Sequence, residues 1–329
     1  MPDDRDVYQA SADVMAVWPD ASGNTVNGLG ESEHGVPRPV FWRTDGSIAH
    51  EAVLYYFYGR DKDNERIVES RRYRQRMDAI PVHELAPETI EKSPAEWTAA
   101  IKAAALEVGA DVVGICAYRP EWTYEDRPQP AGAWAVMLGF SHVYDNMKQA
   151  PDENAYIEVM HQYERAGSTA KHLTNWIRDR GHVAQAKTGP MTEDVLMIPA
   201  AIEAGLGELG KHGSIINRTY GSSIRLAMVT TDMPLIADRP DVFGGDAFCE
   251  SCQLCSNACP PDAIYREKQM VRGTRKWYVD FDKCVPYFVD NKTCGLCLVV
   301  CPWSRPGIAD NLVQKMAKRM AAREADTKG

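Results

Sequence analysis

Long hydrophobic runs, an excess of basic charge and a recognisable N-terminal export signal are all missing from this sequence of 329 residues. Its apolar stretches fall far short of the ~18 residues that a membrane-spanning helix needs. Residues 1–10 are polar and acidic, and the only pair of adjacent arginines, Arg71–Arg72, is not followed by a hydrophobic segment. We therefore expect a cytoplasmic protein that does not use a membrane as a partner.

The charge balance and the composition exclude further classes of protein. Acidic residues outnumber basic ones by 46 to 37, and the formal net charge is −9. Nucleic-acid-binding proteins usually carry a basic field, so nucleic acid is not an expected partner. With 44% apolar, 25% charged and only 9% aromatic residues, the chain is neither disordered nor fibrous. Its length suits about two domains.

Cysteine is abundant in one short region. Eight of the nine cysteines lie between Cys249 and Cys301. The first run has the spacing C-x2-C-x2-C-x3-C-P, the ligand pattern of bacterial ferredoxins, and contains Cys249, Cys252, Cys255 and Cys259. The second run repeats the pattern without its first cysteine, and contains Cys294, Cys297 and Cys301. Cys284, ten residues upstream, supplies the missing ligand.

This spacing predicts two [4Fe–4S] clusters, because three closely spaced thiolates bind one cubane and the fourth cysteine reaches the other. One cluster is assigned to Cys249, Cys252, Cys255 and Cys301. The other is assigned to Cys259, Cys284, Cys294 and Cys297. Zinc sites use paired C-x2-C units and match two runs ending in Cys-Pro poorly. Disulfides are disfavoured in a long chain with its cysteines so confined. Cys116, in an apolar stretch, is expected to be a buried core residue.

Strands alternating with helices predict an α/β sandwich followed by a ferredoxin-like domain. Ser93 and Glu96 form a capping box for a helix that Gly109 ends. Further helices are expected over Glu153–Arg180, Thr192–Ala204 and Asn311–Arg323. Strands are expected over Asp111–Tyr118, Trp134–Phe140 and Ile224–Thr231. The predicted domains are a loop-rich N-terminal extension (1–85), an α/β domain (86–240), a ferredoxin-like domain (241–305) and a helical tail (306–329).

The N-terminal extension gives weaker patterns. Val53–Tyr58 has the aromatic, β-branched composition of a short strand, and the charged segment Asp61–Arg76 suits a solvated helix. We expect this extension to form a lid or a dimer contact, and a homodimer is compatible with the sequence.

A glycine-rich turn occupies Ala204–Gly213. Its Gly205, Gly207 and Gly210 have the spacing GxGxxG, but the turn follows a helix instead of a strand, unlike a dinucleotide-binding fingerprint. One interpretation is a helix end and tight turn that require positive φ. The other is close backbone approach to a bulky ligand, with Lys211 presented to an anionic group.

Several motifs together resemble the reductive dehalogenase family. They are the glycine turn, Tyr220-Gly221-x3-Arg225, Thr231-Asp232-Met-Pro-Leu235, Phe248 before the first cysteine run, and Cys297-x3-Cys301-Pro302-Trp303. Arg180-Gly181-His182-Val-Ala184 is similar to the segment before that family's glycine turn. The same order of motifs occurs in epoxyqueuosine reductases. The resemblance is specific over residues 153–303, weak over 90–152 and absent over 1–85.

The resemblance implies a nitroreductase-like α/β domain that holds a base-off cobalamin beside the two clusters. A tyrosine then donates a proton with help from a basic residue. Tyr163 is the first candidate, Tyr156 the alternative, and Arg225 and Lys211 are candidate basic partners, while His182 and His212 are other candidate proton donors. The expected cobalamin contacts are Gly205, Gly207, Gly210, Lys211, His212, Gly213 and Tyr220.

The expected function is a reductase acting on an organohalide or another small electrophile. The sequence has no fused electron-donating domain and no twin-arginine signal, so an external ferredoxin or flavodoxin is the expected low-potential donor. Only 28 residues follow Cys301, too few for a helical-repeat tRNA-binding domain. Two alternatives stay open: a tRNA nucleoside reductase like epoxyqueuosine reductase, and a non-catalytic protein that transfers electrons or binds a tetrapyrrole.

Overall fold

The computed structural model describes residues 8–189, 194–291 and 293–326. A four-stranded antiparallel sheet lies at its centre, in the order β1-β2-β6-β3. Its strands are β1 (Val112–Ala117), β2 (Trp134–Ser141), β3 (Ala184–Lys187) and β6 (Ile224–Thr231). The central pair is aligned so that Phe140 lies opposite Arg225. This register brings Arg225 to the end of the sheet where β2 leads into His142.

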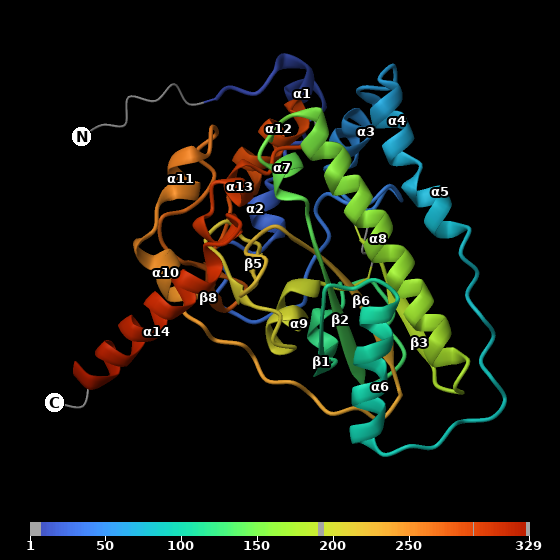
Figure 1. The fold of residues 1–329 in the computed structure, drawn as a ribbon. Helices are drawn as coiled ribbons and strands as arrows, with labels where there is room; N and C mark the ends of the chain where they lie inside the picture. Colours follow the sequence, from blue (N-terminus) through green and yellow to red (C-terminus); the bar gives the residue numbers. More distant parts are fainter. Residues whose placement is uncertain (1–7, 190–193, 292, 327–329) are drawn as a thin grey trace.

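Helices cover both faces of the sheet (Figure 1). Val136 and Leu138 of β2 face one side, where they pack against α6 (Pro94–Glu107) and α8 (Glu153–Arg178). Ala135 and Met137 face the other side and pack against α9 (Met197–Glu203). This alternation along one strand is the period-2 pattern of a sheet buried on both faces. The predicted α/β sandwich is therefore confirmed.

The predicted elements of this layer mostly agree with the structure. Ser93 and Glu96 form the reciprocal capping box of α6. Gly109 and Gly181, which follow α6 and α8, both have positive φ. α9 begins at Met197, later than expected, and the predicted helix start at Thr192 lies outside the described residues. Cys116 is 4% exposed, and burial raises the pKa of its thiol to about 12, as suits a core residue.

The N-terminal segment differs most from the sequence-based expectation, because five helices interrupt its loops. They are α1 (Ala12–Val17), α2 (Gly23–Val26), α3 (Glu51–Gly59), α4 (Glu65–Arg71) and α5 (Tyr73–Asp78). The predicted strand over Val53–Tyr58 is wrong, since these residues lie in α3. Their apolar side chains Val53, Leu54 and Phe57 are buried at helical spacing. Tertiary packing has overridden the local β preference of the aromatic residues.

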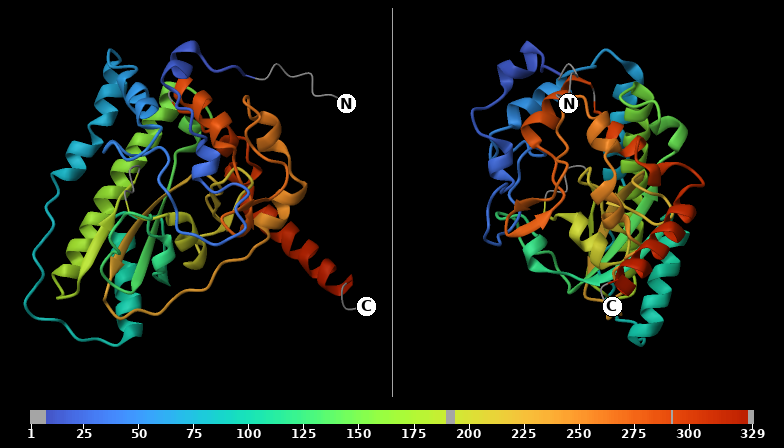
Figure 2. Two further views of the ribbon diagram at one scale, coloured as in Figure 1. Left: turned by 180° about the vertical axis from the view of Figure 1, so that it is seen from behind. Right: turned by 90° about the vertical axis from the view of Figure 1, so that its left-hand side faces the viewer.

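The cysteine-rich region is built from short helices and one hairpin. Its elements are α10 (Gly245–Ser251), α11 (Leu254–Ala258), β7 (Gln269–Val271), β8 (Thr274–Lys276), α12 (Phe281–Asp290), α13 (Leu296–Val299) and η2 (Pro302–Ser304). α14 (Ala309–Asp326) follows and projects from the body of the molecule in Figures 1 and 2. The remaining elements are η1 (Pro120–Trp122), α7 (Tyr144–Met147), β4 (Glu208–Leu209) and β5 (Ile215–Ile216). No described helix is long and apolar enough to cross a bilayer.

The N-terminal helices pack on the cysteine-rich region as well as on α8. Val53 and Phe57 share one apolar core with Val289 of α12 and Met160 of α8. Gly23 lies directly against the ring of Phe281, where a Cβ atom would come within 2.0 Å of the ring. Residues 1–85 and 241–305 therefore share a core, although their sequence patterns suggest separate domains.

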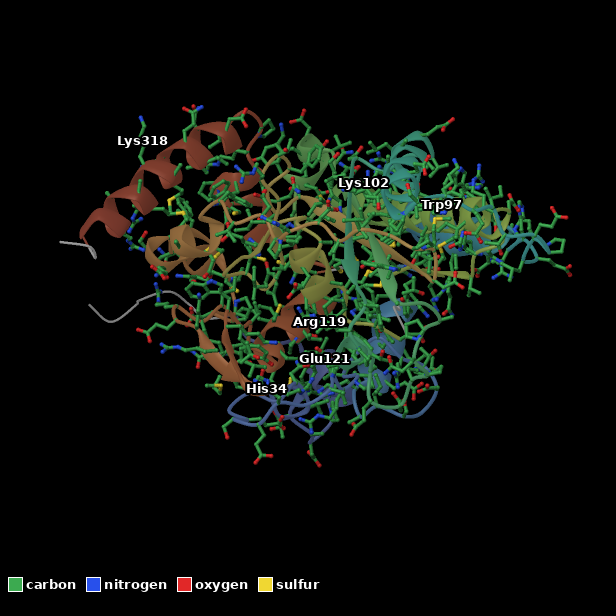
Figure 3. The ribbon with its side chains drawn as sticks, turned by 90° about the horizontal axis from the view of Figure 1, so that it is seen from below. His34, Trp97, Lys102, Arg119, Glu121 and Lys318 are labelled. Atoms are coloured by element: carbon green, nitrogen blue, oxygen red, sulfur yellow. The ribbon has the colours of Figure 1, made fainter. Side chains whose placement is uncertain are left out.

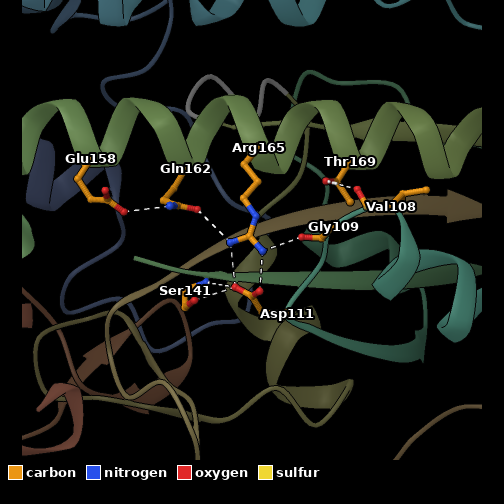
Figure 4. A network of polar contacts seen from close by, with 8 residues as sticks. All are labelled: Val108, Gly109, Asp111, Ser141, Glu158, Gln162, Arg165 and Thr169. Atoms are coloured by element: carbon orange, nitrogen blue, oxygen red, sulfur yellow. Dashed lines mark hydrogen bonds and ion pairs between the residues drawn. The ribbon is translucent and has the colours of Figure 1, made fainter. Parts of the chain in front are cut away.

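A polar network ties α8 to the sheet (Figure 4). Arg165 donates two hydrogen bonds to Asp111, at 2.5 and 3.0 Å, and one to the carbonyl of Gly109. Asp111 also accepts hydrogen bonds from the backbone and the hydroxyl of Ser141. Two turns earlier on α8, Glu158 accepts hydrogen bonds from Gln162 and from the backbone of Val143. The network thus fixes α8 and the segment after β2 together.

Replacing Asp111 with Asn is expected to destabilise the fold by about 1.5–3 kcal/mol near pH 7, the range for hydrogen bonds to charged groups. Burial acts to raise the pKa of Asp111, but hydrogen bonds from Arg165 and Ser141 outweigh it and lower the pKa below its usual value. The carboxylate's contribution is therefore complete above the unfolded-state pKa of ~3.9 and is lost as the pH falls through the folded-state value. Urea unfolding of both proteins across pH 3–7 measures this, and a stability difference that does not shrink in acid would contradict it.

Candidate functional site

The first cysteine set consists of Cys249, Cys252, Cys255 and Cys301, which converge between α10, α11 and η2. Cys249 and Cys301 belong to one apolar cluster with Trp303. The fully buried Lys211 reaches this set: its backbone N–H lies 3.5 Å from Cys249 Sγ, and its ammonium donates to the carbonyl of Cys252 at 2.8 Å. A cation here offsets part of the negative charge that four thiolates would bring.

The second cysteine set consists of Cys259, Cys284, Cys294 and Cys297, which act electrostatically on one another. Burial, and then neighbouring cysteines that include Cys255, raise the pKa of Cys297, so the two sets lie within electrostatic reach of each other. In the part of the chain that the structure describes, no three Cys, His, Asp or Glu side chains converge on one metal ion. A cubane takes its four thiolates on four separate iron atoms and needs them spread further apart.

Two cavities adjoin the second cysteine set. The tyrosine cavity, of roughly 520 Å³, lies between α8, the N-terminal helices and the α12–α13 region, and Tyr163, Arg225, His142 and Cys294 are among its lining residues. The cysteine cavity, of roughly 830 Å³, is lined by all four cysteines of the second set and by His212 and Gly213. The two cavities share four lining residues, Phe288, Cys294, Gly295 and Leu298.

Tyr163 and Arg225 form a pair inside the tyrosine cavity. Tyr163 comes from α8 and Arg225 from β6, and Nη1 of Arg225 donates a hydrogen bond to the Tyr163 hydroxyl at 2.9 Å. The guanidinium also lies over the Tyr163 ring, 4.0 Å from its centroid. The ring of Tyr73 in α5 also stacks with the Tyr163 ring, with an interplanar angle of 19°. The phenol is therefore held in position, with a permanent positive charge beside its oxygen.

A second pair, Tyr156 and Arg71, lies in the same cavity. Nε of Arg71 donates to the Tyr156 hydroxyl at 2.8 Å. Tyr156 is only 1% exposed, and burial raises its pKa although the hydrogen bond from Arg71 acts to lower it. Both tyrosines named from the sequence thus reach the cavity, each with an arginine. Tyr163 is the more open of the two.

His142 is a cavity residue that the sequence analysis missed. Both of its ring nitrogens are buried, and neither has a hydrogen-bond partner among the described residues. Burial, and then the nearby charge of Arg225, lower the pKa of His142 to about 3, so its imidazole is neutral at physiological pH. Buried polar groups are nearly always satisfied. Two unpartnered ring nitrogens therefore point to a ligand or water in the cavity.

The permanently charged side chains that line the tyrosine cavity are all basic. Arg71, Arg74 and Arg225 line it, and none of the described Asp or Glu residues does. Asp61 lies close enough to act on Tyr156, from outside the lining. The other lining residues from the N-terminal segment are apolar or hydroxylated: Trp42, Thr44, Phe57, Tyr58 and Tyr73. A ligand with an anionic or polar aromatic group suits this lining.

Different residues of the glycine turn fit the two interpretations, a tight turn and a close approach to a ligand. Gly205 and Gly207 have positive φ and pack directly against protein backbone, where a Cβ would meet the carbonyls of Arg239 and Ile216 at 2.6 and 2.0 Å. Gly210 packs against the His212 ring. These three glycines therefore meet protein atoms instead of a cavity, whereas His212 and Gly213 line the cysteine cavity. Tyr220 packs beside the apolar cluster under α9 and lines neither cavity.

Lys211 and the candidate histidines have other surroundings than expected. The structure does not bring Lys211 to the Tyr163–Arg225 pair, because its ammonium lies against the first cysteine set. His212 accepts from the Ser214 backbone at Nδ1, so its Nε2 donates to the Ser222 hydroxyl, and burial lowers its pKa to about 4. His182 packs edge-on against Trp97 beside α6, outside both cavities.

Comparison with known proteins agrees with this architecture. Residues 248–304 match the family model described as a 4Fe-4S dicluster domain. A tetrachloroethene reductive dehalogenase of Desulfitobacterium hafniense is 28% identical over 237 residues, which cover 66% of this chain and 42% of that protein. An epoxyqueuosine reductase of Synechocystis sp. is 30% identical over 157 residues, covering 41% and 48% of the two chains. This chain thus spans less than half the length of each relative.

A solved structure shares the fold. A reductive dehalogenase, whose structure was used to infer a mechanism for B12-dependent dehalogenation, superimposes with a TM-score of 0.69 and 29% identity over 79% of this chain and 41% of that one. These similarities support a reductive dehalogenase-like family for this chain, as the motifs of its sequence predicted. The named relatives are reductases.

Proposed function

We propose that this protein is a cobalamin- and iron–sulfur-dependent reductase that replaces a halogen of a small organic molecule by hydrogen. One observation carries the proposal: the Tyr163–Arg225 pair faces the same cavity as Cys294 of the second cysteine set. A proton donor and the end of an electron-transfer route thus meet in one place. The similarity to reductive dehalogenases, one of them tied to B12-dependent chemistry, supports it.

The donor set suits two [4Fe–4S] clusters. Eight cysteines in two groups of four, with the fourth member of each sequence run crossing to the other group, provide the thiolates that two cubanes need. The second group lines both cavities, whereas the first lies beyond it, against Lys211 and Trp303. We infer that clusters held by these two groups would supply a route for electrons toward the cavities, with the second group nearest to them.

The two cavities also suit a corrinoid. They adjoin through Phe288, Cys294, Gly295 and Leu298, and their combined lining is largely apolar and aromatic. Polar atoms buried there without a partner include both ring nitrogens of His142 and Nε of Arg225. A bound corrinoid would supply low-valent cobalt, which delivers electrons to the carbon–halogen bond.

The chain's own residues supply the proton and hold the substrate. Two electrons and one proton convert the carbon–halogen bond to a carbon–hydrogen bond and release halide. Tyr163 gives the proton from its hydroxyl oxygen, and Arg225 stabilises the phenolate that remains because the guanidinium is always charged. Arg71 and Arg74 favour a substrate with a phenolate or carboxylate group. The apolar lining excludes water around the reacting bond.

The iron and cobalt contents of protein made anaerobically with cobalamin supplied test the proposal. We expect about eight irons and one cobalt per chain, from two cubanes and one corrinoid. Halide release is then screened with halogenated phenols and benzoates before neutral chloroalkenes. Eight irons without cobalt would contradict the corrinoid and leave an electron-carrying role. Tight, salt-sensitive tRNA binding would instead favour a nucleoside reductase.

We further propose a cytoplasmic location and an external low-potential electron donor of the ferredoxin or flavodoxin type. Fractionation of the cells that make the protein tests the location.

A further inference from the structure

α14 packs directly on the apolar cluster that contains cysteines of the first set. Met316 of this helix is 2% exposed and belongs to the apolar cluster that contains Cys249, Cys301 and Trp303. Gly244, in the left-handed region with φ 93°, begins α10 under the helix, where a Cβ would lie 2.8 Å from Cβ of Met316. The helix is thus fixed next to the first cluster site, although it projects from the body in Figure 1.

The outer side of α14 is basic. Lys315, Lys318 and Arg319 are exposed, and Figure 3 shows Lys318 on the side of the helix turned to solvent. None of the three has an ion pair with a described side chain. Lys315 and Arg319 are four residues apart, a spacing at which like charges destabilise an isolated helix by a few tenths of a kcal/mol. An acidic partner protein would offset the repulsion within this row of positive charges.

This basic row lies beside the entry to the first cluster site. Nη1 of Arg319 lies 3.5 Å from the hydroxyl of Ser251, the residue before Cys252. Three residues further on, Leu254 exposes 46% of its surface between the ligands Cys252 and Cys255. An exposed apolar side chain bordered by charges is the arrangement of transient protein interfaces, which have an apolar centre and a polar rim. The second cysteine set, by contrast, faces the two cavities.

We propose that Lys315, Lys318 and Arg319, with Leu254 beside them, form the docking surface for an acidic one-electron carrier protein; this rests on the proposed iron–sulfur function. In each encounter the reduced carrier loses one electron and the first cluster gains it. The chain's net charge of −9 repels an acidic carrier elsewhere, so a local basic row directs it to this helix. A small, charged interface also allows the fast dissociation that repeated electron delivery needs.

Stopped-flow reduction of the anaerobically reconstituted full chain tests this surface. The probe is an acidic flavodoxin, fully reduced beforehand, and the readout is bleaching of the cluster absorbance at several salt concentrations. We expect the triple variant K315E/K318E/R319E to react about 10–100-fold more slowly at low salt. The wild-type rate is expected to fall toward the variant's rate as salt is added. The single variant Lys318→Ala is expected to give an intermediate rate.

Two controls separate docking from damage. Reduction by dithionite and the iron content must stay unchanged in every variant. Lys62→Glu reverses an exposed charge between α3 and α4, far from α14, and is expected to leave the flavodoxin rate unchanged. Equal flavodoxin rates for wild type and triple variant would overturn the proposal. So would loss of binding to tRNA or anionic vesicles without loss of electron transfer. Missing cobalt would contradict the proposed reductase while leaving this measurement valid.

Discussion

Replacing Tyr163 with Phe is expected to lower kcat for halide release by about 10²–10⁴-fold, the usual contribution of a positioned general acid. The substitution removes one oxygen atom and leaves the ring in contact with Tyr73 and the Arg225 guanidinium. Cofactor content and KM should change little, because the ring still fills its place and Arg225 still faces the cavity. The measurement is halide release under anaerobic conditions, with iron and cobalt determined on the same sample.

Tyr156 provides the decisive comparison, because it occupies the same cavity with its own arginine. If Tyr163 donates the proton, Tyr156→Phe has the smaller effect on kcat. If Tyr156→Phe instead lowers kcat and Tyr163→Phe leaves kcat unchanged, Tyr156 is the proton donor. Tyr118→Phe serves as the control. Tyr118 directly follows β1, lines neither cavity, and its hydroxyl forms a hydrogen bond with the Thr123 hydroxyl.

Replacing Cys294 with Ala is expected to remove about half of the bound iron, because a cubane that loses one of four thiolates is not retained. The first cysteine set does not include Cys294 and should keep its cluster. Loss of the second cluster also removes folding energy from the segment it ties together. Faster amide hydrogen exchange should therefore appear over α12 and α13, measured by mass spectrometry beside an iron assay.

Cys116→Ala is the matched control for this loss. Cys116 is also a buried thiol, but it packs under α9 with its Sγ 3.4 Å from the carbonyl of Ala200. Its replacement should leave the iron content unchanged and cost only about 1 kcal/mol of stability, as a small core truncation does. A Cys294→Ala protein with full iron, or a Cys116→Ala protein that loses iron, would contradict the cluster assignment.

The cysteine sets and the central sheet were predictable because short-range patterns determine them. Ligand spacing fixes which thiolates come together, and the apolar segment over Trp134–Phe140 is long enough for only a buried strand. The capping box at Ser93 marks its helix by chemistry confined to four residues. Tyr163 and Arg225 were both named from the family motifs, but their direct contact depends on the packing of α8 against β6.

The part of the tyrosine cavity that is lined by the N-terminal segment could not be predicted in the same way. Arg71, Tyr58 and Trp42 lie far along the chain from Tyr163, and each comes from a segment whose local pattern gives no indication of that contact. Val53–Tyr58 even favours a strand by composition, and only its packing on α12 makes it helical. His142 carries no motif, and its significance appears only when both ring nitrogens are found buried and unpartnered.

The hydrogen bonds between the N-terminal helices and α12 have a consequence for biosynthesis. Ser11 donates to Asp290, Ser22 to Asp282, and Asn24 to Asp280, across more than 250 residues of chain. During translation these hydrogen bonds, unlike the contacts with α8, cannot form until α12 has been made, and α12 also carries Cys284. The lining of the tyrosine cavity takes residues from both the N-terminal helices and the α12–α13 region, so it can be completed only after most of the chain has been made.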